Sequence, residues 1–296
     1  MANNLTLGCD CLGAIHYLSG YIADDRGRPV LKENCICIHE QDNGISWKHT
    51  NYRTQRAAVV RNRELVIQSI ITVSNYEYIL CWIFNQAGDI TYEVRATGIL
   101  STCPLDEDIR PEDVPAWGTV VHPGVLAQHH QHFFSLRVDP ALDGHDNRLI
   151  YEDAVALPRH PKTNPHGVGY VTQETVIKES CGMNTDTEKN RRFIIQNANS
   201  KNPVNGRPVS YKIVVAPFQK MLADQESFHY KRCEFADQAV YVTKHRDGEF
   251  FAAGKFTNQV RYVTFVVPTG VGLLLARLTR GWCVVERRRW RADVRL

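Results

Sequence analysis

The chain has 296 residues, of which 43% are hydrophobic and 23% are charged, and its formal net charge at pH 7 is +3. These values match ordinary soluble globular proteins and exclude disordered, collagen-like and coiled-coil chains. No apolar run reaches the roughly 18 residues that a membrane-spanning helix needs, and we expect no secretory signal. Nine cysteines are an odd number in a chain too large to need a disulfide scaffold, so we expect an intracellular protein with mostly reduced thiols.

Most of the chain is predicted to form β-strands, because runs of β-branched and aromatic residues recur between turn formers. In chain order the predicted strands are residues 65–73, 78–84, 90–97, 133–138, 211–215 and 239–243. Residues 90–97 alternate strictly between apolar and polar side chains, and the turn formers at 85–89 predict a hairpin with the preceding strand. Only residues 220–226 predict a helical turn or two. Polar segments with proline, glycine or asparagine predict surface loops at 142–148, 159–169 and 197–208.

This order of elements predicts a mainly β protein built as a large antiparallel β-sandwich, not the alternating strands and helices of a parallel sheet. We treat residues 1–258 as one domain. The remainder is strongly basic, since residues 260–296 hold eight arginines against two acidic residues.

Three histidines lie close together, at positions 129, 130 and 132. If this segment is a strand, His130 and His132 share one face with their Cα atoms roughly 6.6 to 7 Å apart, and His129 points to the other face. Two imidazoles in this arrangement can bind one metal ion, and zinc, copper, iron and nickel all suit them. The alternative is a histidine-rich strand whose rings only form hydrogen bonds.

A second motif covers residues 72–78, Thr-Val-Ser-Asn-Tyr-Glu-Tyr. Composition alone describes it as a strand with a polar interruption. Followed about fifty residues later by His-x-His and Arg-x-Asp, however, it resembles the copper amine oxidases. Further segments that are similar to this family are residues 7–13, 15–18, 37–40, 47–49, 92–100, 117–119 and 202–212. The resemblance extends over about residues 1–258.

The resemblance implies a homodimeric enzyme that oxidises a primary amine with O2 and water to an aldehyde, ammonia and hydrogen peroxide. It implies that Tyr76 is the precursor of topaquinone, whose carbonyl forms a Schiff base with the amine, and that His130 and His132 bind copper(II). Because copper activates the tyrosine ring, the Tyr76 hydroxyl should lie close to both imidazoles. The neighbours of Tyr76 expected in the cofactor pocket are Val73, Ser74, Asn75, Glu77 and Tyr78, of which Asn75 and Glu77 help to orient the ring.

The same resemblance implies two structural features. One is a disulfide between Cys11 and Cys37, for which two free buried thiols are the alternative. The other is a second divalent-cation site that includes Asp139, for which a plain salt bridge is the alternative.

Two departures from the family pattern bear on activity. The catalytic aspartate of the family lies upstream of the segment that Met1–Leu5 resembles. The third copper histidine is expected after Gln259, but no histidine follows His245. We therefore expect residues 259–296 to be a divergent tail, out of frame or disordered, with a genuine basic arm as the alternative.

We accordingly predict an amine oxidase by family whose activity in this chain is weak or absent. The alternative is a non-enzymatic metal-binding or interaction remnant of the same fold. We expect no nucleic-acid or membrane partner, and a cytoplasmic or peroxisomal location.

Overall fold

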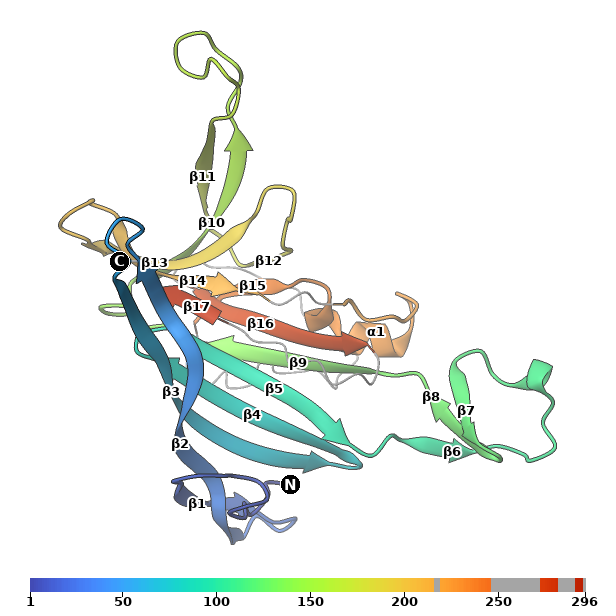
Figure 1. Cartoon of the computed structure of the whole chain (residues 1–296). Helices are drawn as coiled ribbons and strands as arrows, with labels where there is room; N and C mark the ends of the chain where they lie inside the picture. Colours follow the sequence, from blue (N-terminus) through green and yellow to red (C-terminus); the bar gives the residue numbers. More distant parts are fainter. Residues whose placement is uncertain (216–218, 246–271, 282–290, 295–296) are drawn as a thin grey trace. The chain divides into compact units, whose positions relative to one another are not determined.

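The computed structural model describes residues 1–215, 219–245, 272–281 and 291–294 and contains two compact units (Figure 1). The first unit includes residues 1–130, and the second includes residues 131–281. Strands dominate both, and within the described part of the chain no helix has the length and apolar character needed to cross a membrane.

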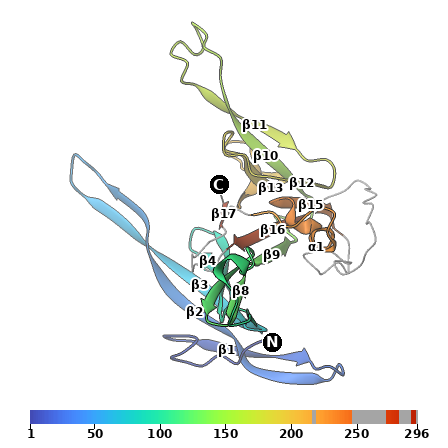
Figure 2. The same ribbon diagram turned by 90° about the vertical axis from the view of Figure 1, so that its right-hand side faces the viewer.

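The first unit is built on five strands that pair consecutively and antiparallel. They are β1 (His16–Ala23), β2 (Pro29–Thr50), β3 (Ala57–Val73), β4 (Tyr76–Asn85) and β5 (Ile90–Gly98). This arrangement confirms the antiparallel strands predicted from residue 65 to residue 100. β3 is much longer than the strand predicted at residues 65–73, and it forms one long hairpin with β2, which was not predicted (Figure 2).

One face of β3 buries every second side chain, as the period of a strand requires. The buried residues are Glu64, Val66, Gln68 and Ile70. Two of these four are polar and need partners inside the sheet. The Glu64 carboxylate, in a side chain only 6% exposed, accepts hydrogen bonds of 2.8 to 2.9 Å from the amides of Gln41, Asn43 and Asn62.

Near Glu64 the pairing of β2 with β3 is irregular twice in succession. The register shifts between Asp42 and Ile45 and again between Ile45 and Trp47, and each shift adds one residue to β2 relative to β3. Such bulges increase the local twist and bend of a strand.

The strict alternation of β5 does not separate a buried face from an exposed one. Thr91 and Glu93 are buried on one face and Val94 on the other. The Glu93 carboxylate forms a salt bridge with Arg95. Both faces of β5 are therefore covered, and the polar residues of the pattern do not mark a solvent-facing side.

A small three-stranded sheet completes the first unit, with β8 between β6 and β7. Its strands are β6 (Thr102–Pro104), β7 (Gly118–His122) and β8 (Val125–Gln128). His129 and His130 directly follow β8.

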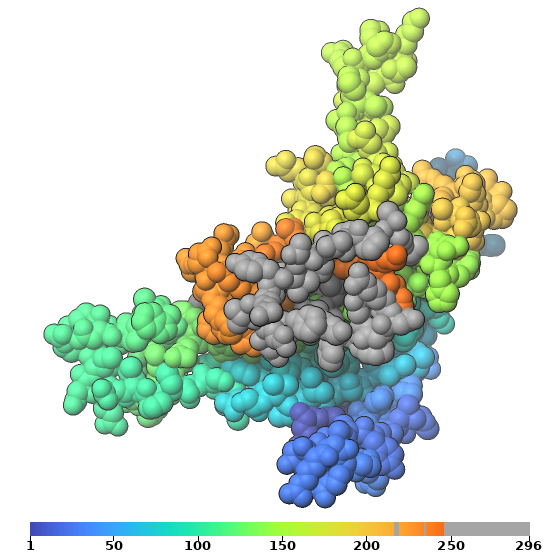
Figure 3. Space-filling model, turned by 180° about the vertical axis from the view of Figure 1, so that it is seen from behind, coloured from blue at the N-terminus to red at the C-terminus, as the bar shows by residue number. Residues whose placement is uncertain are grey.

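The second unit contains two groups of antiparallel strands. The first has the order β14-β13-β10-β11 and consists of β10 (Asn147–Ala156), β11 (Tyr170–Val176), β13 (Arg192–Lys201) and β14 (Pro208–Val214). The second has the order β12-β15-β16-β9 and consists of β9 (Gln131–Val138), β12 (Cys181–Met183), β15 (Val240–Lys244) and β16 (Gly272–Gly281). The β10–β11 hairpin and its loop form a narrow projection (Figure 3).

The prediction of a helical turn at residues 220–226 is wrong. The structure has bends and turns there, and α1 (Phe228–Arg232) follows. Ser227 explains this start, because its hydroxyl oxygen accepts a hydrogen bond from the Tyr230 amide and caps the helix.

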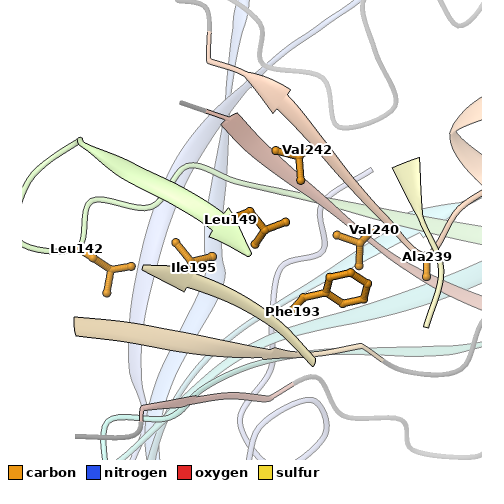
Figure 4. Packing of buried hydrophobic residues seen from close by; sticks show 7 residues of the cluster. All are labelled: Leu142, Leu149, Phe193, Ile195, Ala239, Val240 and Val242. Carbon is orange, nitrogen blue, oxygen red and sulfur yellow. The ribbon is translucent and has the colours of Figure 1, made fainter. Parts of the chain in front are cut away.

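The core of the second unit lies between its two groups of strands (Figure 4). It consists of Leu142, Leu149, Phe193, Ile195, Ala239, Val240 and Val242. Phe193, on β13, is only 1% exposed, and its ring contributes the largest apolar surface of this cluster.

Two parts of the segment expected to diverge, residues 259–296, are strands. β16 pairs with β15 on one side and β9 on the other, and β17 (Arg291–Val294) is short. Residues 246–271 lie outside the described residues, so the boundary at residue 258 stays a prediction.

Replacing Phe193 by alanine should leave a cavity in this core and lower the free energy of unfolding by about 3 to 5 kcal/mol. Urea denaturation followed by tryptophan fluorescence measures the change. Val204→Ala is the control, because Val204 is 93% exposed and should change stability by less than about 0.5 kcal/mol. Equal effects of the two substitutions would contradict the assignment of this core.

Candidate active site

Tyr76 is the first residue of β4 and directly follows a tight turn. Because Val73 pairs with Tyr76, only Ser74 and Asn75 form the loop between β3 and β4. Ser74 has φ of 55°, the left-handed value that the first loop residue of a type II′ hairpin adopts. A non-glycine residue in this region carries strain of about 1 kcal/mol or more, which the surrounding sheet must hold in place.

Gly98 lies opposite Tyr76 at the end of β5 and permits a very close approach of the two backbones. Its φ is +111°, and an added Cβ would lie 2.4 Å from the Asn75 carbonyl oxygen and 2.8 Å from the Tyr76 Cα. The Ile99 amide also donates to that carbonyl at 2.7 Å. The backbone beneath Tyr76 is thus fixed by a contact that no side chain larger than hydrogen allows.

The phenol of Tyr76 reaches His130, although 54 residues separate them in sequence. The Tyr76 Oη lies 2.6 Å from His130 Nε2, and the ring centroids are 5.5 Å apart at an interplanar angle of 54°. This contact confirms the predicted proximity of the Tyr76 hydroxyl to His130.

Two backbone groups define the direction of this hydrogen bond. His130 Nδ1 lies 2.9 Å from the Gln128 carbonyl oxygen, which can only accept, so we assign the ring proton to Nδ1. With the proton on Nδ1, Nε2 accepts the hydrogen bond that the Tyr76 hydroxyl donates. The Ser101 amide donates to the Tyr76 Oη at 3.1 Å, so the phenol oxygen is both a donor and an acceptor.

The other two histidines of the group have different surroundings. His129 Nε2 lies 3.4 Å from Thr119 Oγ1 on β7, so the successive rings of His129 and His130 contact different partners. His132 is the second residue of β9, in the second unit, and its pairing with His130 stays a prediction.

His130 fits a metal ligand, because a metal-binding histidine usually donates its second ring N–H to a carbonyl or carboxylate, as His130 does to Gln128. Within the described residues, however, no three His, Cys, Asp or Glu side chains form a group that could hold a metal ion. Tyr76 and His130 therefore fit a tyrosine-derived cofactor beside an imidazole-bound copper, while the described residues do not supply a complete ligand set.

The other expected pocket residues fall into three environments. Val73, Ser74 and Asn75 are exposed on the turn. Tyr78 is only 8% exposed, and burial, together with the neighbouring Tyr76 phenol, raises the pKa of its hydroxyl. Glu77 is half-buried between strands.

The Glu77 carboxylate is held by two residues that our sequence reasoning did not assign to it. The Thr72 hydroxyl lies 2.9 and 2.8 Å from its two oxygens, and the Asn3 amide donates to one of them at 3.4 Å. The Asn3 amide also donates to the Thr72 hydroxyl oxygen at 2.9 Å. Glu77 therefore joins the turn to the amino-terminal segment.

The expected disulfide between Cys11 and Cys37 is not formed in the structure, which has both residues as buried free thiols. They belong to one apolar cluster with Leu5 and Ile70. Burial, together with the Cys11 thiol, raises the pKa of Cys37 to about 12.

Asp139 forms a salt bridge with His245, at 3.2 Å between its carboxylate and Nε2. Both side chains are exposed, so this pair contributes little to stability. The second-cation site has no support in the described residues, and Asp139 has the plain ion pair that was the alternative.

Comparison with known proteins identifies the family. Residues 1–268 match the family model of the copper amine oxidase enzyme domain. The chain belongs to the copper amine oxidase family. This agrees with the mainly antiparallel β fold and with the contact between Tyr76 and His130.

Copper amine oxidase 1 of Aspergillus niger is 46% identical over 259 residues, which cover 88% of this chain and 38% of that protein. Histamine oxidase of Arthrobacter globiformis is 41% identical over 260 residues, 87% of this chain and 37% of that protein. The crystal structure of a copper-containing benzylamine oxidase from Hansenula polymorpha superimposes with a TM-score of 0.90 at 42% identity, covering 99% of this chain and 48% of that one. The chain thus spans 37% to 48% of the length of these relatives.

Replacing Gly98 by alanine should destabilise the protein more than the backbone strain alone predicts, because the new Cβ meets main-chain atoms next to Tyr76. Gly13→Ala is a matched control, since Gly13 has a similar φ of +103° but nothing within 4 Å of an added Cβ. We expect a loss of about 1 kcal/mol for Gly13→Ala from strain, and at least twice that for Gly98→Ala. Urea denaturation measures both, and equal losses would show that the close approach is not what requires glycine.

Proposed function

We propose that this chain is the part of a copper- and topaquinone-dependent primary-amine oxidase that carries the cofactor tyrosine and two copper ligands. The overall reaction would convert R-CH2-NH2, O2 and H2O to R-CHO, NH3 and H2O2. The observation that carries the proposal is the 2.6 Å contact between Tyr76 Oη and His130 Nε2, on a chain of this family.

When bound, copper(II) would promote oxidation of the Tyr76 ring by O2 to topaquinone, and the quinone would supply the electrophilic carbonyl and electron acceptor that protein side chains lack. His130 and His132 would hold the metal. Ser101 and Gly98 would keep the ring in place, the first through its backbone amide and the second through the absence of a side chain.

The neighbours of Tyr76 would have separate tasks. Asn75, on the strained turn, would contact the cofactor from the solvent side, and buried Tyr78 would exclude water beneath it. Glu77 would help to hold the turn and the ring of residue 76 in place, because its carboxylate already contacts Thr72 and Asn3. Glu77 is therefore a poor candidate for the base that removes a proton from the substrate.

This chain alone would be a weak or inactive oxidase. General-base catalysis contributes about 10² to 10⁴ in rate, and a copper site with two imidazoles lacks the third ligand of the family. The second candidate function is therefore a non-enzymatic metal-binding or interaction protein. Such a protein would keep the fold and the contact between Tyr76 and His130 without the oxidation.

We also infer a homodimer, with the long β2–β3 and β10–β11 hairpins contributing to its interface. A cytoplasmic or peroxisomal location is part of the proposal, supported by the peroxisomal primary amine oxidase of Pichia angusta, which is 39% identical over 266 residues.

Copper titration tests the metal site. His130→Ala should weaken binding of copper(II) at least about tenfold, because it removes one of two imidazoles. His166→Ala is the control, since this exposed histidine lies in the β10–β11 loop. Isothermal titration calorimetry on the metal-free chain provides the affinities, and equal values for His130→Ala and the parent chain would rule out the pair as ligands.

Quinone formation tests the role of Tyr76. Copper and oxygen should produce a visible quinone absorption band, weak in this chain, that Tyr76→Phe abolishes while copper still binds. A redox-cycling quinone stain after gel electrophoresis provides a second readout. A band that persists in Tyr76→Phe would place the cofactor on another residue.

A further inference from the structure

The residue between the two proposed copper ligands makes long-range contacts of its own. The Gln131 side-chain NH2 donates to the Lys220 carbonyl oxygen at 3.1 Å, and the Leu222 amide donates to the Gln131 side-chain oxygen at 2.7 Å. We call this pair of hydrogen bonds the Gln131 clamp. It joins the first residue of β9 to a segment about ninety residues away.

A second contact shows which face of β9 this segment covers. Phe133 packs edge-to-face against Phe235, with ring centroids 6.5 Å apart at 88°. Gln131 and Phe133 are two residues apart on one strand, so their side chains share a face. Residues 220–222 and Phe235 therefore cover the odd-numbered face of β9.

His132 consequently lies on the other face. A strand alternates its side chains, so fixing Gln131 and Phe133 toward the 220–235 segment directs His132 away from it. A slip of one residue at the start of β9 would reverse the faces and turn His132 into this segment.

We propose that Gln131 is a positioning residue for copper binding: its clamp fixes the face and register at the start of β9 and so presents His132 for the metal. This inference rests on the proposed function, because it takes His132 as a ligand.

The chemistry of glutamine suits this task. A primary amide can donate and accept hydrogen bonds at the same time, so it can bind both the Lys220 carbonyl and the Leu222 amide. Glutamate would keep the acceptor for Leu222 and lose the donor for Lys220. Alanine would lose both, so the two substitutions form a graded series.

The experiment compares Gln131→Ala and Gln131→Glu with the parent chain. Gln173→Ala, at an exposed glutamine of β11, is the control. Amide hydrogen exchange at Leu222 reports on the clamp without metal. Titration with copper(II) sulfate, with the copper electron paramagnetic resonance spectrum at saturation, reports on the ligands.

We expect the Leu222 amide of Gln131→Ala to exchange faster. Copper affinity should fall about tenfold, the lower end of the range of losses seen when a group that orients a metal ligand is removed. Gln131→Glu should retain Leu222 protection and bind with intermediate affinity. The copper spectrum of Gln131→Ala should change toward fewer nitrogen ligands, which a general loss of stability does not produce. Gln173→Ala should match the parent chain in every measurement.

Unchanged copper affinity and spectrum in Gln131→Ala, despite loss of Leu222 protection, would overturn the inference while leaving the proposed copper site intact. If the parent chain binds no copper, the proposed function fails and the inference fails with it.

Discussion

The hydrogen bond between Tyr76 and His130 is the interaction on which the candidate site depends. It joins the turn between β3 and β4 to the end of β8, and each partner is held by backbone: Ser101 donates to the phenol and Gln128 accepts from the imidazole. A site positioned by main-chain groups of adjoining strands needs few side chains to keep its geometry. These main-chain contacts hold an exposed imidazole and a half-buried phenol together.

Much of this site could be predicted from the sequence, because its key residues lie in a contiguous motif and a His-x-His pair. The hairpins from residue 65 to residue 98 were also predictable from periodicity and turn formers. The roles of Ser101 and Gln128 could not be predicted, because both act through backbone groups, which every residue type other than proline provides in the same form. The outer halves of β2 and β3 were missed for another reason: their side chains are exposed whether polar or apolar, as Trp47 and Val59 are, so they give no burial signal.

The structure shows contacts of Cys37, Asp139 and Glu77 that the family resemblance did not indicate. Cys11 and Cys37 lie in one buried cluster as free thiols. Asp139 forms an ion pair with His245. Glu77, expected beside the cofactor, is engaged by Thr72 and Asn3. A motif thus locates a residue more reliably than it identifies what the side chain contacts.

The two register shifts in β2 have a consequence for how this hairpin can change in evolution. One extra residue in a strand exchanges the faces of its odd- and even-numbered positions from that point on. The second shift reverses them again, so Trp47 and the residues after it keep the same facing relation to β3 as the residues before Asp42. Because β3 continues without interruption, deleting one of the extra residues of β2 would remove one bulge and leave the pairs beyond it on the same faces. The local twist and bend of the outer hairpin could therefore change without exchanging its two surfaces.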